Sequence, residues 1–319
     1  MTQLTIQQAL QVAEQLLGRA PERLEPFRPA AGGDTSFNFR LWPGAEPMLL
    51  KVMRSPDLPV GVYFHRRIQA AGVPAPDLIS FDAHAGPDGQ ACAIWEWIDG
   101  VHPTWREGEQ CPYDEAELGE MCRRIHDLEF EGEFGYLGDD LSRRTFSESP
   151  DLAPVSSTWP GFFLCDRAAK RLLVGGFITE AEAEVLATLP QRVGRPLADA
   201  PCRLLHMADM MHGSNLILDP KAGRIRALLD YVESAAGDPR WELAFFDFYF
   251  AQIPEDAGFN LARFRAAYGT EHDADDVLGR FYLAAMLVFM KSWYFTDPND
   301  ARGPWALQTL KDILAELAH

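Results

Sequence analysis

Short apolar runs separated by turn-forming residues dominate the first hundred residues, and this pattern predicts strands with one or two helices. MLLKVM (48–53) and ACAIWE (91–96) predict strands, and PAAGGDTSFNFRLWPG (29–44) predicts a strand, a glycine-containing turn and a returning strand. Helical spacing follows a capping box that opens the segment 5–18, and it recurs in VYFHRRIQAAG (62–72). We therefore expect a small β-rich lobe at the start of the chain.

Beyond residues 98–103 the apolar spacing becomes that of amphipathic helices. The segment 114–129 places its apolar side chains on one face, and two further helical patterns lie within 160–190. A long helix is predicted over 275–295 and a last one over 306–318. The second part of the chain should therefore be larger and mainly helical.

The stretch that begins LLHMADMMHGSN carries most of the candidate chemistry. It sets out His206, Asp209, Asn215 and Asp230 around two apolar runs. Those runs predict a hairpin, in which Gly223 is free to take the positive φ of the turn. This order of side chains suits phosphoryl transfer, in which one acid orients a hydroxyl while an amide and a second acid hold Mg²⁺.

Length and composition describe an ordinary globular protein. The 319 residues are enough for two lobes, and the apolar run 281–290 is too short for the roughly 18 residues of a membrane span. A signal peptide is not expected, because no basic stretch followed by an apolar one stands at the N-terminus. The five cysteines form no CxxC pair, so we expect reduced, buried thiols in a cytoplasmic protein.

The net charge of −18 is uneven along the chain. Residues 1–100 hold 8 Lys and Arg against 11 Asp and Glu, and the remainder holds 21 against 36. Such a surface repels nucleic acid and anionic membranes, so neither is an expected partner, and it favours a cationic small molecule. Charge that serves only solubility is the alternative interpretation.

Four ordered segments together resemble the aminoglycoside phosphotransferase and choline kinase-like enzymes, which are small-molecule kinases. They are GGDTSFNFRL (32–41), LLKVM (49–53), WEWIDG (95–100) and the pair LLHMADMMHGSN with LLDYVESAAGDPRWELA. The resemblance implies an α+β, bilobal, protein-kinase-like fold. It also implies a nucleotide-binding lobe over 1–98, a hinge at about 95–103 and a catalytic, substrate-binding helical lobe over 104–319.

The resemblance also implies roles for residues in the N-terminal lobe. Gly32 and Gly33 would let backbone amides approach a phosphate, with Ser36 as a hydroxyl donor. Lys51 would hold the α- and β-phosphates of ATP or GTP. A plain hairpin turn and a surface lysine on an edge strand are the alternatives for these two segments.

In the hinge, the main chain of Glu96, Trp97 and Ile98 would face the base of the nucleotide, as the resemblance implies. Their side chains would matter less than their backbone groups.

In the C-terminal lobe, the resemblance implies that Asp209 is the catalytic base and that Asn215 and Asp230 are ligands of Mg²⁺. His206 is predicted to brace the loop, while a helix cap or turn is the alternative for Asn215 and either aspartate. The loop is two residues longer than the usual one of the family. An alignment without a gap would place Met210 at the catalytic position.

The acidic partner of Lys51 is a second departure from the family. Kinase-like folds pair this lysine with a glutamate on the following helix, but residues 47–95 contain no glutamate. The nearest acid in the sequence is Asp57, and the helix itself offers His65 and two arginines.

The leading hypothesis is an ATP- and Mg²⁺-dependent kinase that phosphorylates a hydroxyl of a small molecule, with an aminoglycoside or amino sugar as the cationic candidate. Asp247, Glu271 and Asp273 are candidate acids for its ammonium groups. A catalytically weak or inactive, pseudokinase-like nucleotide-binding module is the first alternative. A zinc hydrolase that uses His206, Asp209 and His212 is the second. The sequence carries no indication of the oligomeric state.

Overall fold

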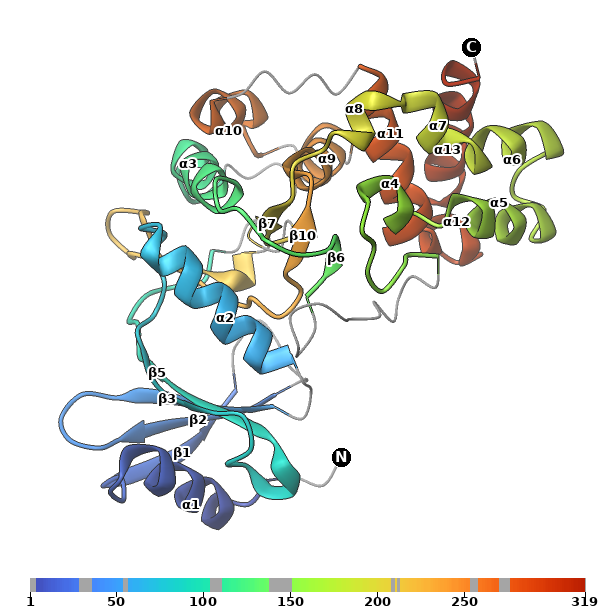
Figure 1. The fold of residues 1–319 in the computed structure, drawn as a ribbon. Coiled ribbons are helices and arrows are strands. Elements are labelled where there is room, and N and C mark those ends of the chain that lie inside the picture. Colours follow the sequence, from blue (N-terminus) through green and yellow to red (C-terminus); the bar gives the residue numbers. More distant parts are fainter. Residues whose placement is uncertain are drawn as a thin grey trace.

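The N-terminal lobe is built on an antiparallel five-stranded sheet in the order β1-β2-β3-β5-β4 (Figure 1). The computed structural model describes residues 4–28, 36–53, 57–103, 111–137, 151–207, 210, 213–252, 258–269 and 276–318. The strands are β1 Arg23–Phe27, β2 Ser36–Trp42, β3 Met48–Met53, β4 Leu78–Asp82 and β5 Ala91–Glu96, with a 3-10 turn at Pro87–Gly89. Lys51 on β3 lies opposite Asn38 on β2 and Ala93 on β5. It therefore lies on a central strand and not on an edge strand.

Two helices cover the two faces of this sheet. Helix α1 (Ile6–Leu17) packs its small buried residues against β2, β3 and β5, and it has the predicted capping box at Thr5. Helix α2 (Asp57–Ala70) covers the other face, where Leu58 and Val62 meet Trp95. The next turn of α2, at Phe64, belongs to the main core of the second lobe. Helix α2 thus touches both lobes, and Figure 1 shows it between them.

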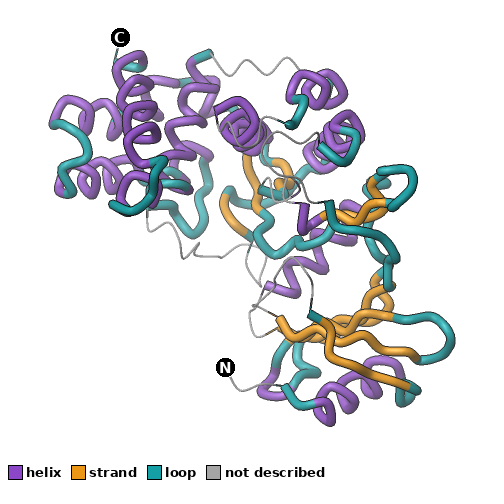
Figure 2. The backbone as a smooth tube through the Cα atoms, turned by 180° about the vertical axis from the view of Figure 1, so that it is seen from behind, coloured by secondary structure: helices purple, strands orange, loops and turns teal. Residues whose placement is uncertain are grey.

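The C-terminal lobe is mainly helical, as Figure 2 shows from behind. Its helices are α3 Glu115–His126, α4 Trp159–Phe162, α5 Cys165–Val174, α6 Glu180–Ala187, α7 Leu189–Val193, α8 Arg195–Ala198, α9 Pro239–Asp247, α10 Leu261–Tyr268, α11 Val277–Ala285, α12 Trp293–Thr296 and α13 Gly303–Glu316. A small sheet joins β6 Gly135–Tyr136, β10 Ala235–Gly237 and β7 Arg203–Leu205, and β8 Leu216–Leu218 pairs with β9 Ile225–Leu228. The predicted α+β, bilobal architecture is confirmed.

The prediction of one long helix over 275–295 is wrong. Helix α11 ends at Ala285, a π-helical segment follows over Met286–Met290, and the short helix α12 comes after Lys291. Lys291 has φ −125°, which is outside the helical region. Helix α9 likewise passes into a π-helical segment, Phe248–Gln252. Apolar spacing alone does not distinguish these wider turns from a continuous α-helix.

Side-chain burial agrees with the other sequence expectations. The apolar face of α3 is buried at Leu118, Met121, Cys122 and Ile125. All five cysteines are free thiols, and burial raises the pKa of Cys92 and of Cys165 to about 12. Across the described ranges, none of the helices is long and apolar enough to cross a membrane.

Candidate functional site

A cavity of about 530 Å³ lies between the two lobes. Its wall is formed by the sheet and α2 on one side and by the β8–β9 hairpin on the other. Seven of the residues singled out in the sequence line it, namely Ser36, Lys51, Glu96, Trp97, Ile98, Asn215 and Asp230. Residues that are more than a hundred positions apart in the chain are therefore brought to one place.

The β8–β9 hairpin brings Asn215 and Asp230 together. Leu216 pairs with Leu228, and the amide of Leu229 donates to the carbonyl oxygen of Asn215 at 2.7 Å. Asp230 is the next residue, so the two candidate metal ligands stand side by side at the open end of the hairpin. At the other end Gly223 has φ 65°, as the turn prediction requires.

Asp230 shows two signs of a binding site. Its φ of 56° lies in the left-handed region, which costs energy for a residue other than glycine. Its Oδ1 is buried and has no hydrogen-bond partner in the part of the chain that the structure describes. A buried carboxylate oxygen without a partner is unfavourable unless a cation or a donor meets it. Together with the amide oxygen of Asn215, it fits the hard oxygen ligands that Mg²⁺ prefers.

His206 braces this pair from behind. Its Nε2 donates to the carbonyl oxygen of Asp230 at 2.8 Å, and its backbone amide donates to Oε2 of Glu242 at 2.8 Å. Burial, the largest influence, lowers the pKa of His206, so the ring is neutral and Nε2 carries its proton. This geometry agrees with the bracing role, while Nδ1 of the ring is buried without a partner among the described residues.

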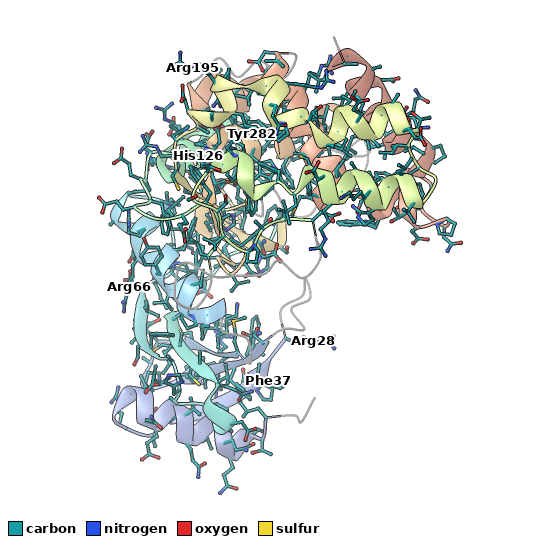
Figure 3. All side chains as sticks on the ribbon, turned by 45° about the vertical axis from the view of Figure 1, so that its right-hand side comes forward. Arg28, Phe37, Arg66, His126, Arg195 and Tyr282 are labelled. Atoms are coloured by element: carbon teal, nitrogen blue, oxygen red, sulfur yellow. The ribbon has the colours of Figure 1, made fainter. Side chains whose placement is uncertain are left out.

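Cationic side chains of the sheet lobe line the same cavity. Lys51 and Arg28 both do so, and Figure 3 labels Arg28 on the N-terminal lobe. Helix α2 presents Leu58 and Gly61 to the cavity, and neither can pair with a lysine. Among the described side chains, no carboxylate lies within 4.0 Å of the Lys51 ammonium; the side chain of Asp57 is outside that set. Lys51 thus brings a positive charge to the cavity, where it could meet a phosphate.

The segment 96–98, predicted as the hinge, lines the cavity. The Glu96 carboxylate turns away and accepts from the amide of Asp77 at 3.1 Å. Trp97 is held by an edge contact with Phe27, at 5.0 Å between ring centroids, and by Arg40 at 4.2 Å above its ring. No backbone hydrogen bond engages the amide of Ile98 within the described ranges. That amide can therefore meet a ligand.

Sequence reasoning missed His102, which also lines the cavity. It follows Val101, which pairs with Leu218 through two backbone hydrogen bonds of 3.0 and 2.8 Å. Glycines allow this close approach, because a Cβ at Gly100 would lie 2.4 Å from Ile217 and one at Gly213 would lie 2.0 Å from the Pro103 carbonyl oxygen. Gly100 and Pro103, which interrupt the strand pattern, were the signal in the sequence.

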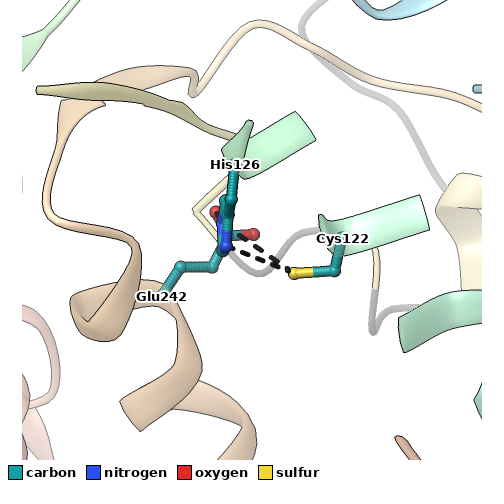
Figure 4. A group of neighbouring side chains, drawn as sticks. All are labelled: Cys122, His126 and Glu242. Carbon is teal, nitrogen blue, oxygen red and sulfur yellow. Dashed lines mark hydrogen bonds and ion pairs between the residues drawn. The ribbon is translucent and has the colours of Figure 1, made fainter. Parts of the chain in front are cut away.

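A buried polar network was also missed (Figure 4). Oε2 of Glu242 accepts from Nε2 of His126 at 3.0 Å, and Nδ1 of His126 lies 2.9 Å from the hydroxyl of Tyr268. The Sγ of Cys122 is 3.8 Å from both ring nitrogens, so it lies off the lone-pair direction of either. The three side chains Cys122, His126 and Glu242 therefore form a buried polar network, in which the hydrogen bond from His126 to Glu242 is the closest contact. Figure 3 shows His126 within the helical lobe.

Several predicted residues lie outside the described residues. They are Gly32, Gly33, Asp209, His212, Glu271 and Asp273. Met210 is described and fully buried in the main core, so its side chain does not reach the cavity. An alignment that places Met210 at the catalytic position would therefore leave that position without a base.

Two acids of the helical lobe have structural roles. Asp247 is buried and forms an ion pair with Arg265, so the expectation that it receives an ammonium group of the substrate is wrong. Asp238 caps α9 by accepting from the amide of Arg240 at 3.0 Å, and it accepts from the hydroxyl of Tyr282 at 2.7 Å.

Solved structures of phosphotransferases share this fold. A thermostable mutant of aminoglycoside phosphotransferase APH(4)-Ia, in ternary complex with AMP-PNP and hygromycin B, has a TM-score of 0.60 at 17% identity. The match covers 93% of this chain and 94% of that one. A putative aminoglycoside phosphotransferase from Ralstonia eutropha JMP134 has a TM-score of 0.57 at 18% identity, with 98% of both chains covered. Spectinomycin phosphotransferase APH(9)-Ia, in complex with ADP and spectinomycin, has a TM-score of 0.53 at 13% identity, covering 98% of this chain and 97% of its own.

The bilobal fold and the sequence family described next are those of a small-molecule phosphotransferase of the protein-kinase-like class. The model of the phosphotransferase enzyme family, APH, matches residues 27–278. The chain therefore belongs to this family, and the expected resemblance is confirmed. No curated protein matches the sequence significantly.

Proposed function

We propose that the protein transfers the γ-phosphoryl group of ATP to a hydroxyl of a small molecule in a reaction that depends on Mg²⁺. The observation that carries this proposal is the buried, unpartnered Oδ1 of Asp230 beside Asn215, in a cavity that also contains Lys51. A ligand set of hard oxygens facing a lysine suits a metal-bound triphosphate. Related structures contain AMP-PNP or ADP, which supports nucleotide binding by this chain.

In this proposal each of the site residues has a separate role. Asn215 and Asp230 would hold Mg²⁺, which supplies neutralisation of the phosphate oxygens when bound. Lys51 orients the α- and β-phosphates, with the backbone near Gly32, Gly33 and Ser36 covering them. We assign Asp209 the task of accepting a hydrogen bond from the substrate hydroxyl and aiming it at the γ-phosphate.

We further propose that the main chain of Glu96, Trp97 and Ile98 recognises the base, with the lobe boundary inside the hinge at about 95–103. Because Glu96 and Trp97 direct their side-chain polar groups to Asp77 and Asp99, they leave base contacts to the backbone. Backbone recognition is compatible with either adenine or guanine, so GTP is the alternative donor.

An aminoglycoside or other amino sugar is the acceptor we propose. Hygromycin B and spectinomycin are bound in the related structures, and the charge of the helical part of the chain is strongly negative. The acids that would meet ammonium groups do not include Asp247, because Arg265 already pairs with it. Glu271 and Asp273 stay as candidates.

The test begins with thermal unfolding of the protein in Mg–ATP, Mg–GTP and EDTA. A nucleotide that binds the folded state at a hundred times its Kd adds about 2.7 kcal/mol to the free energy of unfolding. Turnover is then measured across amino sugars, neutral sugars and amino alcohols. A protein that neither gains stability from nucleotide nor consumes it with any hydroxyl substrate would contradict the proposal.

A catalytically weak nucleotide-binding module is the second candidate, and the surroundings of Lys51 favour it. The two residues that α2 presents to the cavity, Leu58 and Gly61, offer no carboxylate to position this lysine. Nucleotide binding without turnover of any acceptor would support this candidate. Turnover that disappears in Asp209→Asn would support the kinase instead.

A further inference from the structure

We infer that His102 is the residue that recognises the sugar of the nucleotide, through a hydrogen bond between its Nε2 and a ribose hydroxyl. The inference rests on the proposed nucleotide site and adds a specificity-determining residue to it. Three observations carry it: the tautomer of the ring, the rigidity of its segment and its place between the two ends of the cavity.

The hydrogen bond on the inner edge of the ring determines the tautomer. Nδ1 of His102 lies 2.9 Å from the carbonyl oxygen of Leu216. A carbonyl oxygen only accepts, so Nδ1 must carry a proton. In the neutral ring Nε2 is then an acceptor, and within the described ranges no side chain or backbone group is bonded to it. A ribose hydroxyl can donate to this nitrogen.

The segment that carries His102 is held firmly. Val101 forms a two-hydrogen-bond bridge with Leu218, and the glycines at 100 and 213 allow the segment to press against the β8 side of the hairpin. Successive side chains of an extended segment point to opposite faces. The Val101 side chain is accordingly 48% exposed, whereas His102 lines the cavity. A fixed segment keeps the acceptor in place before a ligand arrives, which lowers the entropy lost on binding.

The position of His102 between two subsites identifies its ligand group. It comes six residues after Glu96 of the hinge, where the base is proposed to bind. Its ring is bonded to Leu216, the residue directly after the proposed metal ligand Asn215. A nucleotide that spans these two ends places its sugar between the base and the phosphates, so the sugar is the group that a residue connected to both ends would meet.

The test compares binding of ADP, 2′-deoxy-ADP and 3′-deoxy-ADP, each with Mg²⁺, by isothermal titration calorimetry. This choice needs no knowledge of the acceptor substrate. We expect the wild type to bind ADP about 3- to 10-fold more tightly than at least one of the deoxy analogues, because that analogue lacks one hydrogen bond. His102→Ala should bind ADP as weakly as the wild type binds that analogue, with the analogue's own affinity unchanged.

Two further variants keep the experiment decisive. His102→Phe retains the volume of the ring without either nitrogen, and it should lose the preference even if His102→Ala does not fold. Val101→Ala changes the neighbouring side chain that faces solvent, and it should keep the preference in full.

The outcomes separate this inference from the proposed function. Equal binding of ADP and both analogues by the wild type overturns the inference, and so does a preference that survives in the folded His102 variants. Loss of the preference in Val101→Ala would also overturn it, because a general disturbance of the segment would then explain the effect. Absence of binding by all three nucleotides would overturn the proposed function itself.

Discussion

Two acidic residues, the fully buried Glu242 and the half-buried Asp230, are hydrogen-bonded to His206 in different ways. Glu242 is fully buried, and its Oε2 accepts from the His206 amide and from His126. Asp230 accepts from the His206 ring through its backbone carbonyl, while its side-chain Oδ1 is buried without a partner. A carboxylate whose charge is met by donors holds the structure together. A buried carboxylate oxygen without a hydrogen-bond partner is unfavourable by itself, and it is suited to bind a cation or a hydrogen-bond donor of a ligand.

The difference shows that the surroundings of each oxygen indicate the role of an acid. Glu242 has neighbours of metal-binding type, Cys122 and His126, but its Oε2 already accepts two hydrogen bonds. Asp230 is half-buried, and its Oδ1 has no partner among the described residues. We therefore expect changes at Glu242 to affect folding and changes at Asp230 to affect chemistry.

The largest expected effect is at Asp230. Asp230→Asn keeps the shape and removes the charge that faces the cavity, so kcat/KM for nucleotide should fall by about 10³-fold, as for the loss of a metal ligand worth several kcal/mol. The free energy of unfolding without ligand should stay the same or rise, since the buried Oδ1 has no hydrogen bond to lose among the described residues.

Steady-state kinetics at several Mg²⁺ concentrations and denaturant unfolding check both halves of this prediction. Asp219→Asn, at the turn of the same hairpin, is the control and should keep its activity, because the Asp219 carboxylate accepts from the turn amides of Lys221 and Ala222 and does not line the cavity. Full activity in Asp230→Asn would remove the distinction between the two carboxylates.

Glu242→Ala should show the opposite profile. It leaves a buried imidazole and the His206 amide without their acceptor, so the free energy of unfolding should fall by about 3–5 kcal/mol. Guanidinium unfolding measures this loss. Glu129→Ala serves as the control, because Glu129 is an exposed partner of Arg203 and such pairs contribute less than about 1 kcal/mol. Equal losses in the two variants would show that the network does not stabilise the fold.

Lys51→Met tests the positive side of the cavity. The loss of a charged hydrogen bond to phosphate should weaken ADP binding by about 10- to 100-fold, with little change in stability. Lys221→Met, at the exposed hairpin turn, should bind ADP normally. Calorimetric titration measures the affinity of each variant for ADP. An unchanged affinity in Lys51→Met would mean that the phosphates of ADP do not contact Lys51.

The smallest expected effect is a graded dependence of stability on pH, and it concerns the histidine that links the two carboxylates. Burial lowers the pKa of His206 and of His65 in the folded state. The unfolded chain therefore binds more protons below its ordinary histidine pKa of about 6.5, so stability should decrease as pH falls from there.

Urea unfolding at a series of pH values between 7.5 and 5.5 measures this slope. His65→Gln removes one buried imidazole and should make the slope shallower. A stability that rises on acidification through this range would show that these rings are charged in the folded state.

Much of the site could be predicted because local patterns identify its parts. The turn at Gly223 and the apolar runs around it predicted the hairpin, and the hairpin makes Asn215 and Asp230 neighbours whatever the rest of the chain does. The flanking segments likewise predicted that Lys51 lies in a strand. These are short-range relations, which sequence spacing records well.

Long-range partners could not be predicted in this way. Nothing near Asp247 in the sequence indicates Arg265 as its partner, so an acid used for structure was mistaken for one that binds substrate. The π-helical segment over Met286–Met290 has an apolar pattern that suits an uninterrupted helix equally well. His102 carries no motif, and its place in the cavity follows from how Val101 pairs with Leu218.

The sequence by itself determined which elements form, because apolar spacing, caps and turns act over a few residues. It also determined the class of protein, since four ordered segments carry the family. The tertiary structure alone decided which polar groups have hydrogen-bond or ion-pair partners, because those partners come from distant parts of the chain. For that reason only the structure assigned Glu242 a structural role, whereas Asp230 was already a candidate metal ligand in the sequence.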